Sequence, residues 1–130
     1  MRFLLFVLAA IFVALPAHAT VPTVDQPIAV LRALDKMTAR VEELDVPVNQ
    51  PLKFGTLEIT VHSCRITPPE ETPEAAAYLE VSEFKPGEKD AQIFHGWMFA
   101  SSPALSAMEH PIYDIWVTGC KDKPAAAPAK

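Results

Sequence analysis

The stretch that decides the fold runs from Ile93 to Cys120 and reads IFHGWMFASSPALSAMEHPIYDIWVTGC. It contains both tryptophans of the chain, two of its four histidines and the second of its two cysteines. Residues 92–99 are apolar on both faces, which is typical of a strand in the middle of a fold. Residues 112–118 alternate and are rich in β-branched and aromatic side chains, so they predict a second strand.

A short helix is expected between these two strands. Ser102 is a favourable N-cap residue, and Pro103 suits the first helical position. Pro111 disfavours a helical conformation at the residue before it. The helix is therefore expected to span Pro103 to Glu109.

The segments upstream predict further strands. In the segment from Leu57 to His62, Leu57, Ile59 and Val61 alternate with polar residues, which indicates a half-buried strand. Residues 75–81 predict another strand, which returns through a turn into 92–99. Residues 67–74 hold three prolines and three glutamates, so they are expected to form an exposed loop. Together these patterns predict a mainly β domain, a small sandwich or a partly closed barrel.

The segment from Ile28 to Leu44 is ambiguous. Val30, Leu34, Met37, Val41 and Leu44 recur at helical spacing, which favours a helix over at least its first half. An apolar alternation continues after this segment, however, and favours strands. Both readings stay open at this point.

The amino terminus has the pattern of a secretory signal peptide. An apolar run from Phe3 to Leu15 follows Arg2 and leads into Ala17-His18-Ala19, so cleavage is expected after Ala19. The run is shorter than the ~20 residues that cross a bilayer. We therefore expect a periplasmic or secreted protein without a transmembrane anchor after processing. The expected organisation is a signal peptide (1–19), a flexible arm (20–27), a single compact domain (28–120) and a disordered Ala/Pro tail (121–130).

Charge narrows the range of partners. Without Arg2, the mature chain has 10 Lys and Arg against 16 Asp and Glu, a net charge of −6. Nucleic acids and anionic lipids are bound by clustered basic residues. Neither class of partner is expected.

The two cysteines, Cys64 and Cys120, are expected to form a disulfide. An even pair in an exported protein is most simply oxidised. A redox-active thiol pair is disfavoured, because there is no C-x-x-C spacing and no helix start beside either cysteine.

The segments Phe54 to Cys64 (FGTLEITVHSC) and Gly96 to Cys120, with Leu34 to Ala39 (LDKMTA) upstream, resemble an exported bacterial family known as domain of unknown function 2155. The resemblance covers the chain from about Leu31 to Cys120. It implies an envelope or periplasmic setting and one cysteine pair, and it implies no catalytic residues. It also favours strands over residues 34–48.

Two chemical sites can be drawn from the sequence, and neither is favoured. Ser102, His110 and Asp114 are the residue types of a nucleophilic triad, but Ser102 lacks a G-x-S-x-G elbow and is more simply an N-cap. A metal-binding module around His95 and His110, with Glu109 and Asp114, lacks a good tetrahedral arrangement, because Glu109 and His110 are adjacent. No catalytic residue, metal site or cofactor is therefore predicted.

An aromatic ligand face is the remaining candidate. Trp97, Tyr113 and Trp116, with His110, are residue types that stack on sugar rings or peptide side chains, although packing in the core explains them as well. The sequence thus predicts an exported, non-enzymatic accessory or binding protein of the cell envelope. Its expected partner is an envelope protein, peptidoglycan or a polysaccharide.

Overall fold

A computed structural model describes residues 21–123, which form two β-sheets. In chain order the elements are β1 (Val24–Asp25), β2 (Ile28–Asp35), β3 (Arg40–Pro47), β4 (Leu52–Phe54), β5 (Leu57–Ile66), β6 (Ala75–Glu83), β7 (Ala91–Phe99), η1 (Pro103–Leu105) and β8 (Tyr113–Lys121). The predicted signal peptide and the tail beyond residue 123 lie outside the described residues. Between residues 21 and 123, no helix is long and apolar enough to cross a bilayer.

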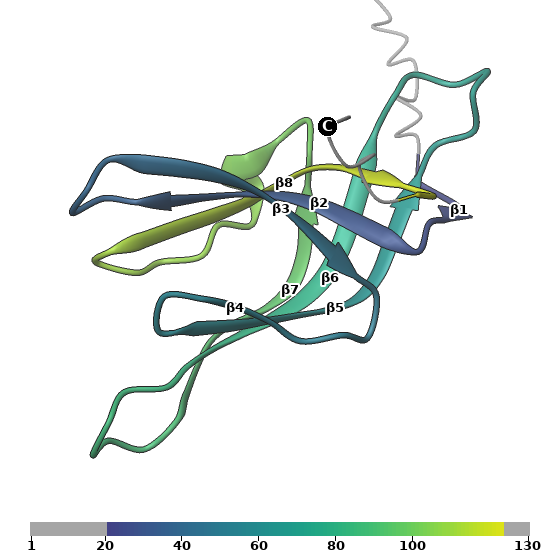
Figure 1. The fold of residues 1–130 in the computed structure, drawn as a ribbon. Coiled ribbons are helices and arrows are strands. Elements are labelled where there is room, and N and C mark those ends of the chain that lie inside the picture. Colours follow the sequence, from purple (N-terminus) through teal and green to yellow (C-terminus); the bar gives the residue numbers. More distant parts are fainter. Residues whose placement is uncertain (1–20, 124–130) are drawn as a thin grey trace, which may run out of the picture.

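The two sheets are packed as a sandwich. The five-stranded sheet has the order β1-β5-β6-β7, and β4 also pairs with β5. β1 and β4 pair with opposite ends of β5, so part of the predicted flexible arm is a strand. The three-stranded sheet has the order β3-β2-β8 and crosses over the larger sheet, whose strands are strongly curved (Figure 1). The predicted mainly β class is confirmed, in its sandwich form, because the sheets do not close into a barrel.

The core lies between the sheets and uses every second residue of the strands. On β5, Leu57, Ile59 and Val61 are fully buried, as their alternation predicts. On β6, Leu79 and Val81 are buried in the same phase. The remaining members of the core cluster are Ala29, Leu31, Ala33, Val46, Cys64, Ala77, Met98, Met108, Ile115 and Val117.

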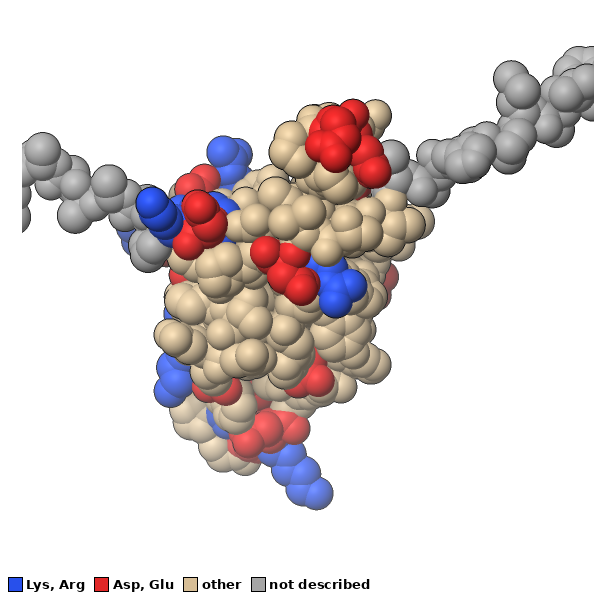
Figure 2. Space-filling model, turned by 90° about the vertical axis from the view of Figure 1, so that its right-hand side faces the viewer, with Lys and Arg blue, Asp and Glu red and all other residues tan. Residues whose placement is uncertain are grey.

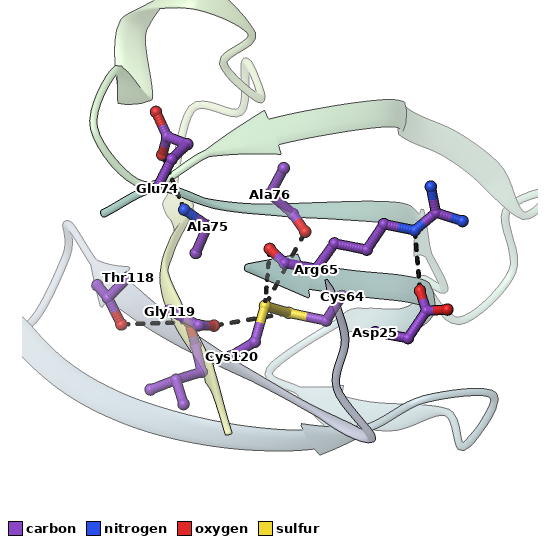
Figure 3. The surroundings of a disulfide bond; sticks show 10 residues. Asp25, Cys64, Arg65, Glu74, Ala75, Ala76, Thr118, Gly119 and Cys120 are labelled. Carbon is purple, nitrogen blue, oxygen red and sulfur yellow. Dashed lines mark hydrogen bonds and ion pairs between the residues drawn. A yellow bond between two sulfur atoms is a disulfide. The ribbon is translucent and has the colours of Figure 1, made fainter. Parts of the chain in front are cut away.

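The predicted disulfide between Cys64 and Cys120 is confirmed. It joins β5 of the five-stranded sheet to β8 of the three-stranded sheet, with 5.9 Å between the two Cα atoms (Figure 3). Cys64 is opposite Ala77, near the start of β6. The bond therefore fastens the two layers together near one end of β6.

Of the two readings left open for residues 28–44, the helical one is wrong. Residues 28–47 form an antiparallel hairpin of β2 and β3, as the family resemblance favours. The turn is closed by Asp35 Oδ1, which accepts hydrogen bonds from the amides of Met37 (2.9 Å) and Thr38 (3.2 Å). Met37 and Val41, which belong to the helical pattern, are 78% and 55% exposed, whereas Ala29, Leu31 and Ala33 are buried with a period of two. The residues that form the core therefore follow the period of two that is typical of a strand.

The predicted helix from Pro103 to Glu109 is also wrong. Only Pro103–Leu105 forms a turn of 3-10 helix, and within the described chain the Ser102 side chain makes no capping hydrogen bond. After this turn, residues 107–110 have no regular secondary structure, and Met108 and His110 are both buried. In a helix, residues two positions apart point to different sides, so a helix here would not bury both side chains against the same core.

β7 lies at an edge of its sheet and not in the middle of the fold. It pairs with β6 alone among the described strands. One of its faces, with Met98, points into the core, and the other, with His95, Trp97 and Phe99, points out of the sandwich. The apolar side chains on the outer face of β7 pack on side chains of the neighbouring strands of the same sheet. The strand is therefore apolar on both faces although no second layer of the described chain covers its outer face.

Candidate functional site

The four residues of the predicted ligand face are not on one surface. Trp97 lies on the outer face of the five-stranded sheet. Trp116 lies on the outer face of the three-stranded sheet, because its neighbours Ile115 and Val117 point into the core. Tyr113 and His110 pack together between the sheets, with ring centroids 5.3 Å apart. The structure brings together only the last two.

Trp97 belongs to a cluster that the sequence analysis did not assemble, which we call the outer aromatic cluster: His62, Arg65, Tyr78 and Trp97. Tyr78 is opposite Trp97 in the β6–β7 register, and their rings meet edge to face at 5.5 Å. His62 lies 6.0 Å from the Tyr78 ring, and the Arg65 guanidinium lies 5.9 Å from the centre of the Trp97 ring. The cluster therefore spans three strands on a solvent-facing surface.

Two acidic residues border the outer aromatic cluster. Arg65 Nε pairs with Asp25 Oδ1 of β1 at 2.8 Å. His62 Nε2 lies 3.4 Å from Glu80 Oε2 on the neighbouring strand. Arg65 and His62 remain 45% and 40% exposed, so they are positioned by these pairs and still accessible.

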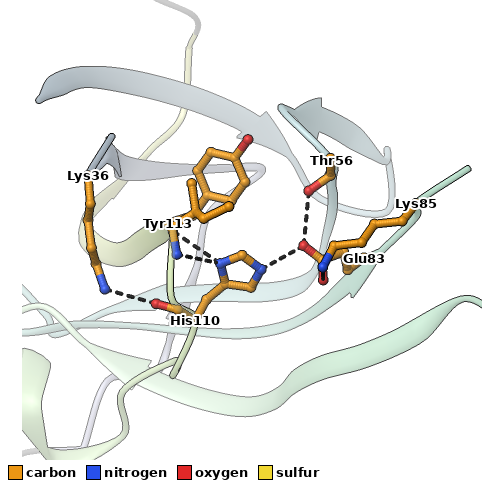
Figure 4. Close-up of polar contacts among 7 residues, drawn as sticks. Lys36, Thr56, Glu83, Lys85, His110 and Tyr113 are labelled. Carbon is orange, nitrogen blue, oxygen red and sulfur yellow. Dashed lines mark hydrogen bonds and ion pairs between the residues drawn. The ribbon is translucent and has the colours of Figure 1, made fainter. Parts of the chain in front are cut away.

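The second polar arrangement is buried between the sheets and is centred on His110 and Glu83 (Figure 4). His110 Nδ1 accepts hydrogen bonds from the amides of Ile112 (3.0 Å) and Tyr113 (3.1 Å). A ring nitrogen that carries a proton cannot accept a hydrogen bond. The proton of the neutral His110 ring is therefore on Nε2. Nε2 donates it to Glu83 Oε2 at 2.6 Å. Both ring nitrogens are therefore fully used.

Glu83 is surrounded by donors. Besides His110, Thr56 donates from Oγ1 to Oε2 at 3.0 Å, and Lys85 Nζ lies 3.3 Å from Oε1. Burial alone raises the pKa of Glu83, but the hydrogen bonds from His110, Thr56 and Lys85 outweigh it, so the pKa lies below its ordinary value. Glu83 is thus a carboxylate at neutral pH, which accepts hydrogen bonds from His110 and Thr56 and forms an ion pair with Lys85.

The structure does not assemble the triad of Ser102, His110 and Asp114. The His110 ring is bound to Glu83, and Asp114 pairs with Lys36 Nζ at 3.0 Å. Lys36 Nζ also donates to the carbonyl oxygen of His110 at 2.8 Å. Ser102 is exposed beside η1. This arrangement anchors the segment before β8 and leaves the imidazole no free nitrogen to act as a base.

The two histidines of the metal hypothesis are also apart. His95 is exposed on β7, whereas the His110 side chain is 2% exposed in the interior. Over residues 21–123, no group of three or more His, Cys, Asp and Glu residues is arranged to hold a metal ion.

A weak signal for Glu83 exists in the sequence. Leu79, Val81 and Glu83 share one phase of β6, so a carboxylate continues the buried face. A buried acidic side chain is costly unless another group pairs with it or donates a hydrogen bond to it. The partner, His110, is 27 positions further along the chain, and no local pattern identifies it.

The buried arrangement makes a prediction for Gly55. Gly55 has φ +57°, and a Cβ there would lie 2.3 Å from the Tyr113 hydroxyl. We expect Gly55→Ala to lower the free energy of unfolding by about 2 kcal/mol, through backbone strain and displacement of the Tyr113 ring. Gly87→Ala is the matched control, because Gly87 has φ +77° but no described atom within 4 Å. Urea unfolding that gives equal losses for both variants would contradict the role of Tyr113.

Comparison with known proteins places this arrangement in a family. Residues 29–120 match the family model described as an uncharacterized protein conserved in bacteria, DUF2155. The chain belongs to this family. The part of the chain that matches the DUF2155 model contains both cysteines, Glu83, His110 and the outer aromatic cluster.

One relative of this DUF2155 chain is an uncharacterized protein of Rickettsia prowazekii (strain Madrid E). The two sequences are 34% identical over 88 residues, which is 68% of this chain and 57% of the relative. The match thus spans little more than half of that protein's length. No solved structure matches this DUF2155 chain.

Proposed function

We propose that this protein is exported to the bacterial envelope and acts there as a non-enzymatic accessory protein, which binds another protein through the outer aromatic cluster. Export is supported by the apolar segment Phe3–Leu15 with the small residues that follow it, and by the disulfide, which forms and persists in oxidising compartments. A non-enzymatic role is supported by His110, whose two ring nitrogens already have partners.

The observation that carries the proposal is the composition and geometry of the cluster. Trp, Tyr and Arg are the residue types that contribute most of the binding energy at protein interfaces. Here Trp97 contacts both Tyr78 and Arg65 in the unbound protein. Because these side chains are already ordered, they lose less conformational entropy when a partner binds.

The position of Arg65 favours a protein partner over a polysaccharide. A sugar ring stacks on the open face of an indole, but the Arg65 guanidinium lies over the Trp97 ring. A guanidinium on an indole, bordered by Asp25 and Glu80, presents both apolar area and charge to a partner. That combination fits the mixed core and rim of a protein interface.

Photo-crosslinking in the native bacterium tests the proposal. A photoreactive residue is placed at His95, which is exposed on the same face as the cluster, and it is expected to crosslink to one discrete partner protein. The crosslinked form of this protein is expected to begin at Thr20. Trp97→Ala should remove the adduct, because it deletes the centre of the cluster. Trp116→Ala is the matched control, since that tryptophan lies on the other sheet, and it should leave the adduct intact. Absence of an adduct, an adduct that survives Trp97→Ala, or a chain that retains its first 19 residues would refute the proposal.

A further inference from the structure

A groove of about 490 Å³ lies at one end of the sandwich and shares no lining residue with the outer aromatic cluster. The residues that line it are Ile66, Thr67, Pro68, Pro69, Glu71, Pro73, Glu74, Ala75, Ala100, Ser101, Thr118, Gly119 and Cys120. One wall is the proline-rich loop between β5 and β6, and the opposite wall is the end of β8. Figure 3 shows Glu74 and Ala75 facing Thr118 and Gly119 across this region, beside the disulfide.

The loop wall is fixed by its own hydrogen bonds. Thr67 N donates to the carbonyl oxygen of Glu74 at 3.0 Å, and Thr67 Oγ1 donates to that of Thr72 at 3.0 Å. The Glu74 carboxylate accepts hydrogen bonds from Ala75 N (2.9 Å), Ser101 N (3.1 Å) and the Ser101 hydroxyl. Burial raises the pKa of Glu74, but these hydrogen bonds outweigh it and lower the pKa. The wall is therefore pre-formed and negatively charged.

Gly119 in the β8 wall pairs with Val30 beside a β-bulge, and no steric contact within the described chain requires it to be glycine. Its φ lies outside the left-handed region, and a Cβ built on it would meet no described atom within 4 Å. The register shift at Val30 beside it does not call for a glycine at this φ. Glycine weakens a strand interior, and there it often marks a bulge or a place where a ligand or another backbone approaches closely. The missing side chain keeps this wall of the groove open.

β8 also has a free edge. In the described chain it pairs with β2 on one side and with no strand on the other. Alternate backbone amides and carbonyls of such a strand point away from its neighbour, and an extended chain can bind them by strand addition. An extended peptide segment suits both this edge and the open wall at Gly119.

The rim selects the charge of the occupant. Glu71 is exposed and lines the groove, and the ionised Glu74 lies on the same wall. Figure 2 shows acidic side chains gathered on the projecting loop, above a surface with few charges. We propose that this groove is a docking site for an extended segment of a partner protein that carries a Lys or Arg side chain, with its backbone passing over Gly119.

Peptide binding to the oxidised full chain tests this site. The probe is a positional-scanning library of fluorescein-labelled nine-residue peptides, in which the central residue is fixed as Lys, Arg, Gln or Glu. Fluorescence anisotropy at low salt should show that the Lys and Arg pools bind more tightly than the Glu pool, by about fivefold. Gly119→Leu should weaken binding at least about tenfold, because the leucine fills the groove. Val41→Leu, an exposed strand position outside the groove, should have no effect.

Charge reversal gives a second matched pair. Glu71→Lys should remove the preference for basic pools, whereas Glu70→Lys, the neighbouring residue outside the groove lining, should keep it. The proposal is overturned if no pool binds, or if Gly119→Leu binds as well as the wild type with an unchanged melting temperature. Loss of binding in Trp97→Ala but not in Gly119→Leu would also overturn it, while leaving the outer aromatic cluster as the binding surface. The two proposals therefore fail separately.

Discussion

Removal of the disulfide by the double substitution Cys64→Ala and Cys120→Ala is expected to lower the free energy of unfolding by about 4 kcal/mol. The bond joins residues 56 positions apart, and chain-entropy arguments assign about this value to a loop of that length. A small domain has a total stability of about 5–15 kcal/mol, so the loss leaves it marginally folded. Guanidinium unfolding of the oxidised wild type and of the double variant measures the difference.

Dithiothreitol provides the control for this measurement. It should destabilise the wild type by a similar amount and leave the double variant unchanged, because the variant has no sulfur pair to reduce. A loss below about 1 kcal/mol in both comparisons would mean that the sheets are held together by their packing and not by the bond between β5 and β8. In that case the cysteine pair would need another explanation than stability.

The parts of the fold that could be predicted from sequence are those with a local signal. The alternation from Leu57 to Val61 identified β5 and its buried face, and the turn around Gly87 identified the β6–β7 hairpin. The disulfide followed from chemistry, because only two cysteines were available in a chain with the sequence pattern of export. Each of these inferences needs only a few neighbouring residues or the number of cysteines. None of them requires knowing which sheets pack together.

The hairpin of β2 and β3 shows where local patterns fail. Val30, Leu34 and Val41 fit a helical period, yet Leu31 and Ala33 between them are the buried positions. Which set of residues becomes the core is decided by the opposing sheet, since a strand or a helix can each offer an apolar face here. Only the partner surface distinguishes the two periods.

The candidate sites depend even more on distant contacts. The alternation of residues 112–118 predicted β8, but it did not reveal which sheet would cover Tyr113 or Trp116. Tyr78 and Trp97 lie on adjacent strands of one hairpin, and the sequence pattern did not reveal that the solvent-facing side would be the one carrying both rings. Gly119 was not singled out at all, because the absence of a side chain leaves no pattern in hydropathy.

The second large effect is expected at His110, whose substitution by alanine should lower the free energy of unfolding by about 3 kcal/mol. The change leaves Glu83 as a buried carboxylate without its main partner, and it removes the acceptor for the amides of Ile112 and Tyr113. It also removes the ring that stacks on Tyr113. Urea unfolding at pH 7 measures the loss, and a value within about 0.5 kcal/mol of zero would exclude a stabilising role for the pair.

Glu83→Gln separates the charge of this pair from its shape. Glutamine keeps an acceptor for His110 Nε2 but no charge, so a loss of about 1 kcal/mol at pH 7 is expected from replacing a charged acceptor with a neutral one. The pKa of Glu83 is lower in the folded protein than its ordinary value of 4.5. Its carboxylate therefore stabilises the fold above that value, and the stabilisation is lost as the pH falls through the lower, folded pKa.

The difference between wild type and Glu83→Gln should accordingly be constant near neutral pH and shrink on acidification below about pH 4.5. Glu80→Gln is the matched control, because Glu80 is on the same strand and also lies beside a histidine, His62, but is 42% exposed. An exposed pair contributes little, so this variant should stay within about 0.5 kcal/mol of the wild type at every pH. Equal pH profiles for the two variants would show that burial beside His110 does not increase the contribution of the Glu83 carboxylate to the free energy of unfolding. The disulfide lies near the start of β6, and Glu83 is the last residue of the same strand. A pH-dependent contribution from Glu83 therefore means that the sandwich is stabilised at both ends of β6, by a redox-sensitive bond at one end and by a pH-sensitive contact at the other.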